Sequence, residues 1–126
     1  IRFTTSDIAA IGRVTSGVKG INLAEGDEVI AGIVLDDKTK QLALVSKNGY
    51  GKKVELSEFT CQGRGGKGLK LGVELAGAAL VNNEDNLLLL GKPNSICISC
   101  AEMPVQGRTT LGVKLAQNEI KNVVIV

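Results

Sequence analysis

The chain has 126 residues, 44% of them hydrophobic, and its 15 Lys and Arg against 13 Asp and Glu give a formal net charge of +2. This length fits one modest domain or part of a larger repetitive one, and the hydrophobic content excludes an intrinsically disordered chain. The absence of histidine removes the commonest general base and the commonest zinc ligand. The apolar runs are far too short to cross a bilayer, so no membrane partner is expected. The start at Ile1, with no initiator Met, indicates an excerpt of a longer protein.

In chain order, residues 6–11 predict at most a brief helical turn, and the rest of the chain predicts short β-strands. Five aliphatic runs have the length and residue types of strands, namely 29–35, 41–45, 53–56, 78–81 and 87–90. Turn-forming residues separate them, and Asn48-Gly49 between two such runs is the strongest hairpin signal. No segment sustains a helical period, so the fold class is all-β.

Three copies of the pattern Gly-Arg-x-x-x-Gly divide the chain, at residues 12–17, 63–68 and 107–112. They are offset by 51 and 44 residues, and the similarity extends beyond the pattern at the same offsets. An acidic residue and a large apolar residue precede the copies, at Asp7-Ile8, Glu58-Phe59 and Glu102-Met103. An apolar residue and a lysine follow them, at Val18-Lys19, Leu69-Lys70 and Val113-Lys114. Units of this length with about four short strands are typical of propeller blades, so we expect a partial array of two to three blades.

Three cysteines do not make a disulfide framework in a chain of this size, and a reducing compartment is the simpler interpretation. Cys97 and Cys100 form a lone Cys-x-x-Cys with no second pair and no histidine, so no metal site is expected. They lie in an alternating, strand-like segment, where residues three apart face opposite sides. We expect small buried thiols here.

The second repeat contains a glycine-rich box, Gln62-Gly63-Arg64-Gly65-Gly66-Lys67-Gly68. Bare backbone beside two cations is suited to phosphate binding, through amide donors, a guanidinium fork and an ammonium charge. The structural alternative is a turn that connects blades. A P-loop is excluded because no Gly-Lys-Ser/Thr opens a helix, and a dinucleotide site is excluded because the βαβ context is absent.

Charge is concentrated around this box. Residues 1–39 hold four Lys and Arg against six acids, residues 40–70 hold seven against two, and residues 71–126 hold four against five. A basic block with few aromatic residues suits the backbone of a duplex rather than single strands, which need stacking platforms. No recognition helix is visible, so base readout is not expected.

The box resembles the glycine-rich box of the DNA gyrase A subunit, Gln-x-Arg-Gly-Gly-Arg/Lys-Gly. Residues 1–29 and the segment Asn48-Gly49-Tyr50-Gly51-Lys52-Lys53 are similar to a late blade of the same C-terminal domain. The paralogous topoisomerase IV A subunit shares this architecture, and the intact box favours gyrase. In the third repeat Cys97 stands where Arg2 and Lys53 stand in the first two, so its segment lacks their cation.

The resemblance implies that residues 1–126 are a fragment of one β-pinwheel domain, a propeller-like array that wraps DNA on a basic rim. It implies a bacterial cytoplasmic protein whose parent subunit pairs with itself and with a B-type ATPase subunit, supports DNA supercoiling, and relies on ATP and Mg²⁺ bound elsewhere. No catalytic residue or cofactor is expected in this chain, and Tyr50 is interpreted as structural. The cations expected to contact duplex DNA are Arg2, Arg13, Lys19, Lys52, Lys53, Arg64, Lys67, Lys70 and Arg108.

Two other functions stay open on the residues alone. A propeller-type protein-interaction scaffold would need an exposed apolar or aromatic patch, for which the chain has one Tyr, two Phe and no Trp. An enzyme would need a base or paired carboxylates at a plausible site, and none is visible.

Overall fold

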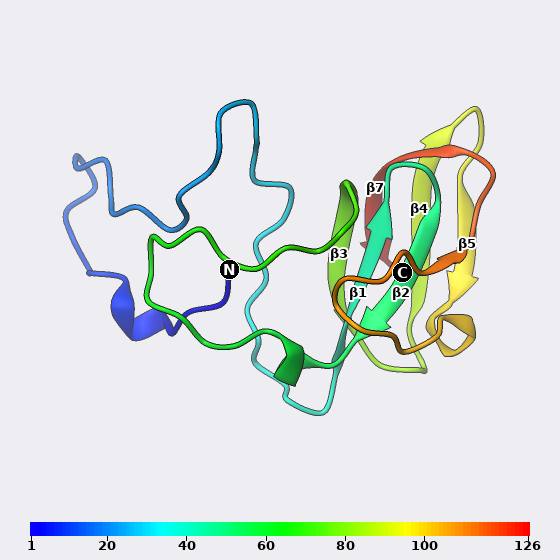
Figure 1. Cartoon of the computed structure of the whole chain (residues 1–126), viewed down its shortest axis with the longest axis horizontal. Coiled ribbons are helices and arrows are strands. Elements are labelled where there is room, and N and C mark those ends of the chain that lie inside the picture. The colour runs from blue at the N-terminus through cyan, green and yellow to red at the C-terminus, as the bar shows by residue number, and fades with distance from the viewer. The chain divides into compact units, whose positions relative to one another are not determined.

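The computed structural model describes all residues, 1–126, and the chain forms two compact units. Unit 1 comprises residues 1–28 and 59–70, and unit 2 comprises residues 29–58 and 71–126. All seven strands lie in unit 2, and helical structure is limited to three single-turn 3₁₀ helices (Figure 1). The all-β prediction is therefore confirmed.

The first sheet of unit 2 has the strand order β3-β1-β2-β6 and is antiparallel throughout. Its strands are β1 (Gln41–Ser46), β2 (Tyr50–Val54), β3 (Leu75–Val81) and the two-residue β6 (Val113–Lys114). The hairpin expected at Asn48-Gly49 joins β1 to β2, and Gly49 has φ +87°, which a residue with a Cβ rarely adopts. The third repeat thus supplies the fourth strand of a sheet that the second repeat begins.

The second sheet has the order β5-β4-β7, also antiparallel. Its strands are β4 (Asn86–Lys92), β5 (Ile96–Ser99) and β7 (Glu119–Ile125). The core joins both sheets: Val45 of β1 and Val81 of β3 are buried in one cluster with Leu87 and Leu89 of β4 and Ile120 of β7. Aliphatic side chains fill most of this core, together with Cys100 and Met103, and it contains no aromatic residue, as the composition predicts.

The 3₁₀ helices mark the repeat. They are η1 (Thr5–Asp7), η2 (Leu56–Glu58) and η3 (Cys100–Glu102), and each ends on the acidic residue that precedes a Gly-Arg copy at the matched offset. The brief helical turn expected within residues 6–11 is η1, shifted toward the N-terminus. In unit 1 backbone hydrogen bonds take the place of strands, including Gln62 N to Arg2 O at 2.8 Å and Gly65 N to Gly20 O at 2.9 Å.

Two strand predictions need correction. Residues 29–35 form no strand, although their sequence closely parallels β3, and Val29 and Val34 are 63% and 70% exposed. The reason is that no strand of the chain pairs with them, whereas β3 pairs with β1 from Leu75 to Val81, with one bulge. The strand expected at 53–56 lies earlier, as β2, because the chain turns into η2 at Leu56.

The cysteine prediction holds for one thiol of the pair. Cys100 is buried at the start of η3, and burial raises the pKa of its thiol. Cys97 is exposed on β5, which pairs with β4 on one side only, so its other edge is open. No helix is long and apolar enough to span a membrane.

Candidate nucleic-acid interface

The glycine-rich box of unit 1 folds as a tight loop closed around Ile1. Gly65 and Gly68 have φ of +84° and +78°, and a Cβ on Gly68 would lie 3.0 Å from the backbone nitrogen of Ile1. A Cβ on Gly66 would lie 3.5 Å from Cδ1 of the same residue. The glycines are therefore required sterically by the fold. This agrees with the alternative interpretation of the motif as a turn that connects blades.

The Arg64 side chain also helps to hold this loop in place. Its Nε donates to the carbonyl oxygen of Asp7 at 2.8 Å, and a terminal nitrogen donates to the carbonyl oxygen of Lys19 at 2.7 Å. The side chain is half-buried. Arg2 is also half-buried and donates to the carbonyl oxygen of Phe59 at 3.3 Å.

Arg108 of the third repeat repeats the contact of Arg64 within unit 2. Its Nε donates to the carbonyl oxygen of Glu58 at 3.2 Å, and its backbone N–H donates to Oε1 of Glu58 at 3.2 Å. Glu58 is the residue that the sequence offsets match to Asp7. Both arginines therefore bind the last carbonyl of a 3₁₀ helix, where a cation is favoured.

Lys52 and Lys53 require a correction, because the basic rim expected from the sequence included them and both are buried, with 1% and 3% exposure. The Lys52 ammonium donates to the carbonyl oxygens of Gly107, Arg108 and Thr110 and to the hydroxyl of Thr110. Lys53 donates to Oδ1 of Asn83. Neither ammonium can reach a phosphate in this arrangement.

Burial lowers the pKa of Lys52, with the Glu58 carboxylate opposing the shift and Arg108 adding to it. Sequence patterns did not predict the oxygen acceptors of Lys52, which belong to Gly107, Arg108 and Thr110. The recurrence of the Gly-Arg pattern was the only feature of the sequence that pointed to this loop. No local pattern links a lysine to a loop 55 residues away.

The exposed cations of unit 1 lie on the segments around its two Gly-Arg copies. They are Arg13, Lys19, Lys67 and Lys70. Unit 1 holds six Lys and Arg against four acids, whereas unit 2 holds nine of each and buries two of its lysines. The excess positive charge of the chain is thus carried by unit 1.

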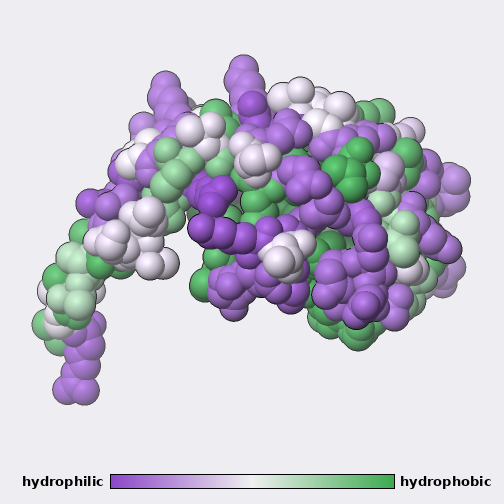
Figure 2. Space-filling model, turned by 90° about the horizontal axis from the view of Figure 1, so that it is seen from below, coloured by the Kyte–Doolittle hydropathy of each residue, from purple (hydrophilic) through white to green (hydrophobic).

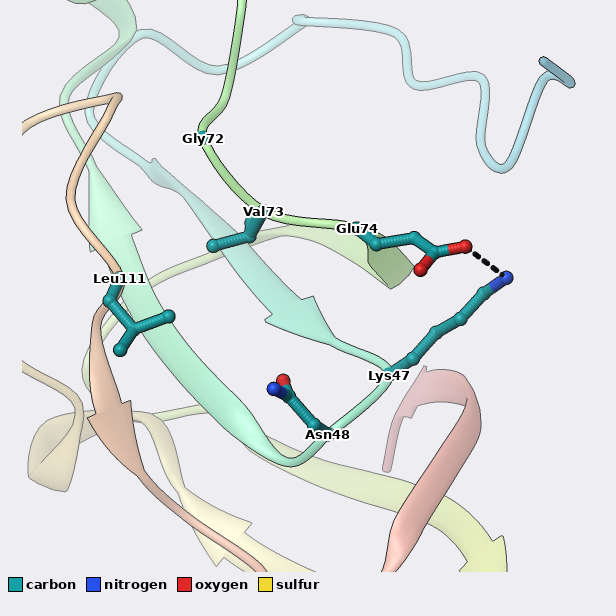
Figure 3. A pocket seen from close by; sticks show the side chains of 6 residues that line it. All are labelled: Lys47, Asn48, Gly72, Val73, Glu74 and Leu111. Atoms are coloured by element: carbon teal, nitrogen blue, oxygen red, sulfur yellow. Dashed lines mark hydrogen bonds and ion pairs between the residues drawn. The ribbon is translucent and has the colours of Figure 1, made fainter.

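A depression of about 310 Å³ in unit 2 is lined by Lys47, Asn48, Gly72, Val73, Glu74 and Leu111 (Figure 3). Lys47 and Glu74 point toward one another across its rim and form an ion pair of 2.9 Å. Its charged groups are therefore already paired. No group of three or more His, Cys, Asp or Glu in the chain is placed to hold a metal ion.

The surface is mostly hydrophilic on the face shown in Figure 2, with hydrophobic side chains scattered between polar ones. The largest exposures of aliphatic residues are those of Val14 and, within residues 29–35, of Val34 and Val29. Tyr50, the single tyrosine, lies with Lys114 Nζ 4.9 Å from its ring centroid, a cation–π contact that suits the structural role expected of it.

Residues 1–36 and 40–82 match the profile of a family described as DNA gyrase C-terminal domain, beta-propeller. The chain belongs to this family. The matched residues of the gyrase C-terminal domain include the first two Gly-Arg copies and the whole glycine-rich box, while the third copy lies beyond them.

Curated relatives agree with this assignment. The DNA gyrase A subunit of Lawsonia intracellularis is 39% identical over 127 residues, which cover 93% of this chain and 15% of that protein. The A subunits of Kosmotoga olearia and Staphylococcus epidermidis are 38% and 33% identical, over 93% and 91% of this chain. The chain spans about 15% of the length of these relatives.

Solved structures show the same fold. The C-terminal domain of DNA topoisomerase IV superposes with a TM-score of 0.91 at 22% identity, covering 98% of this chain and 42% of that one. A DNA gyrase A C-terminal domain superposes with a TM-score of 0.80 at 25% identity, covering 96% and 45%. The propeller-like, partial array predicted from the repeats is confirmed by these matches and by the two antiparallel sheets.

Proposed function

We propose that this gyrase-type domain binds duplex DNA by its phosphate backbone, without reading its sequence, and holds the duplex on a curved path. The observation that carries the proposal is the exposed positive charge of unit 1, at Arg13, Lys19, Lys67 and Lys70. Cations that neutralise phosphates release condensed counterions, which supplies most of the affinity in sequence-independent binding.

The secondary structure supports binding of this kind. The chain has no α-helix to enter a major groove, and contacts to phosphates position a protein on DNA without specifying bases. Bending a short duplex costs on the order of 1–6 kcal/mol, so several cations must act together to hold a curved path. Of the nine cations named from the sequence, we keep these four. We assign the buried Lys52 and Lys53 to the fold, and with them the three arginines whose side chains donate to backbone carbonyl oxygens, Arg2, Arg64 and Arg108.

The proposal also covers the longer protein to which this domain would belong. We propose a bacterial cytoplasmic type IIA topoisomerase A subunit, of the gyrase type, that pairs with itself and with a B-type ATPase subunit. Its ATP, Mg²⁺ and cleavage chemistry would be held outside these 126 residues, and this chain would supply the path of the duplex during DNA supercoiling.

The test neutralises three unit 1 cations together, Arg13→Gln, Lys19→Gln and Lys67→Gln. The matched control neutralises three exposed lysines of unit 2, at Lys38, Lys92 and Lys121. Binding to a duplex shorter than the persistence length of about 150 bp is titrated across salt concentrations, and bending is followed by energy transfer between labelled ends.

We expect the unit 1 variant to lower the slope of log affinity against log salt by about 2 to 3, at about 0.9 for each lost contact. The unit 2 variant should leave both slope and bending nearly unchanged. If both variants lowered the salt slope and the bending equally, the binding would be nonspecific charge attraction and unit 1 would have no special role. If neither variant changed the salt slope or the bending, the proposal of DNA binding would be refuted and the protein-interaction scaffold would be favoured.

A further inference from the structure

Two of the three Gly-Arg copies each enclose one side chain. The loop at 107–112 encloses Lys52, and the loop at 63–68 encloses Ile1. Ile1 and Lys52 are related by the repeat offset of 51 residues. Their neighbours Arg2 and Lys53 make the same parallel bridges, to Cys61 and Val105. The enclosed residue therefore occupies one structural position, but it is aliphatic in one repeat and cationic in the other.

The fourth residue of the loop differs in the same way. In the loop around Lys52 it is Thr110, whose hydroxyl accepts from the Lys52 ammonium at 3.2 Å and contacts the carbonyl oxygen of Gly107 at 2.9 Å. In the loop around Ile1 it is Gly66, which has no hydroxyl, and its carbonyl oxygen accepts from the backbone of Asn22 at 2.8 Å. The loop that contains a threonine at this position thus binds an ammonium group, which donates to several of its oxygens.

The first Gly-Arg copy, residues 12–17, has a threonine at this position and the same internal geometry. The Thr15 hydroxyl donates to the carbonyl oxygen of Gly12 at 2.7 Å, and its backbone N–H donates to the same oxygen at 3.2 Å, as for Thr110 and Gly107. Gly17 has φ +84° and its counterpart Gly112 has φ +89°. The hydrogen bonds that shape an ammonium-binding loop are therefore formed in the first copy too.

This first loop encloses nothing. A Cβ on Gly12 or Gly17 would meet no atom within 4 Å, whereas one on Gly112 would lie 2.6 Å from the carbonyl oxygen of Gly51, next to Lys52. All six residues of the first loop are exposed. Val18 and Lys19, the counterparts of β6, pair with no strand, while β6 pairs with β2 at the residues just before Lys52.

We propose that residues 12–17 form a socket for the ε-ammonium group of a lysine carried on a β-strand of another repeat unit. The carbonyl oxygens of Gly12, Arg13 and Thr15 and the hydroxyl of Thr15 accept its N–H groups, and Val18–Lys19 add to the edge of the strand. An aliphatic residue would offer these oxygens no N–H group. The oxygens carry no net negative charge, which favours an ammonium with directed N–H groups over a divalent metal ion.

The probe is a peptide with the sequence of residues 48–56, which carries the strand β2 and Lys52, titrated into the ¹⁵N-labelled chain. We expect saturable shifts at the amides of residues 12–19 and none at the occupied loop, residues 63–68. A peptide with Lys52→Ile should bind at least tenfold more weakly. In the chain, Thr15→Gly should weaken binding of the unchanged peptide to a similar extent, whereas Thr15→Ser, which keeps the hydroxyl, should change it less than threefold.

Several results would overturn the socket. Equal binding of the two peptides would show that the lysine is irrelevant, and equal binding to the Thr15→Gly chain would exclude the hydroxyl. Shifts of the same amides by KCl or CaCl₂ at equal concentration, in place of the peptide, would indicate a metal site. Absence of saturable shifts with the peptide would exclude a strand-borne lysine. None of these outcomes bears on duplex binding, which is measured separately.

Discussion

The Nε atom of Arg64 lies 2.8 Å from the carbonyl oxygen of Asp7, 57 residues earlier in the chain. The equivalent bond joins Arg108 to Glu58 at 3.2 Å, across 50 residues. The arginines of the second and third motifs therefore fasten their loops to the 3₁₀ helix of the preceding repeat. The motif that suggests phosphate binding in the sequence is also a clasp between consecutive repeats.

Arg64→Ala should lower the free energy of unfolding by about 1–2 kcal/mol, because two charge-assisted hydrogen bonds to backbone carbonyls are lost from a half-buried site. The matched control is Arg13→Ala, since Arg13 is exposed and should change stability by less than about 0.5 kcal/mol. Thermal denaturation followed by circular dichroism measures both. Equal shifts would show that the clasp contributes nothing.

Lys52→Met should destabilise the chain by about 1–3 kcal/mol, because the carbonyl oxygens of the 107–112 loop lose their donor inside the protein. Lys121→Met is the control, since that lysine forms an exposed ion pair with Glu119. Amide hydrogen exchange in residues 107–112 should accelerate in the first variant only. Unchanged exchange there would contradict the role of the ammonium group.

The same lysine should leave a signature at alkaline pH. Its pKa in the folded state is lowered by burial from the ordinary 10.5, so between the lowered value and 10.5 the unfolded chain binds more protons. The contribution of Lys52 to stability should therefore rise with pH through that window and be flat below it. The difference in unfolding free energy between wild type and Lys52→Met, measured from pH 7 to 11, tests the sign.

The hairpin, the repeat equivalence and the fold class follow from local signals: Asn48-Gly49 requires a turn, and the Gly-Arg offsets pair Asp7 with Glu58. What the sequence did not reveal depends on partners far along the chain. Residues 29–35 have the composition of a strand but no strand to pair with. Lys52 is indistinguishable from a surface lysine until the loop 55 residues later encloses it.

The three thiols should react unequally. Cys61 and Cys97 are exposed, whereas Cys100 is buried and the pKa of its thiol is raised by that burial. Ellman's reagent should titrate two thiols rapidly in the native chain and the third only on unfolding. Cys100→Ala should abolish the slow phase, and a slow phase that persists in this variant would place the protected thiol elsewhere.

Gly112→Ala should be strongly destabilising, by about 2–4 kcal/mol, because a methyl group at φ +89° would also lie 2.6 Å from the carbonyl oxygen of Gly51. Gly12→Ala is the matched control at the first position of another copy, where φ is not positive and nothing lies within 4 Å. Chemical denaturation should separate the two variants clearly. Similar midpoints would contradict the close approach of β2 to the third loop.

The enclosure of Lys52 by residues up to 58 positions later has a consequence for folding during synthesis. Such contacts raise the contact order of the chain, and loops of this length must close before the contacts form. At about 5–20 residues per second, a ribosome needs roughly 3–12 s between adding the lysine and adding the residues that carry its oxygen acceptors. In that interval the ammonium group has none of its oxygen acceptors and β2 lacks its pairing with β6, so the first sheet is complete only after residues 107–114 have been synthesised.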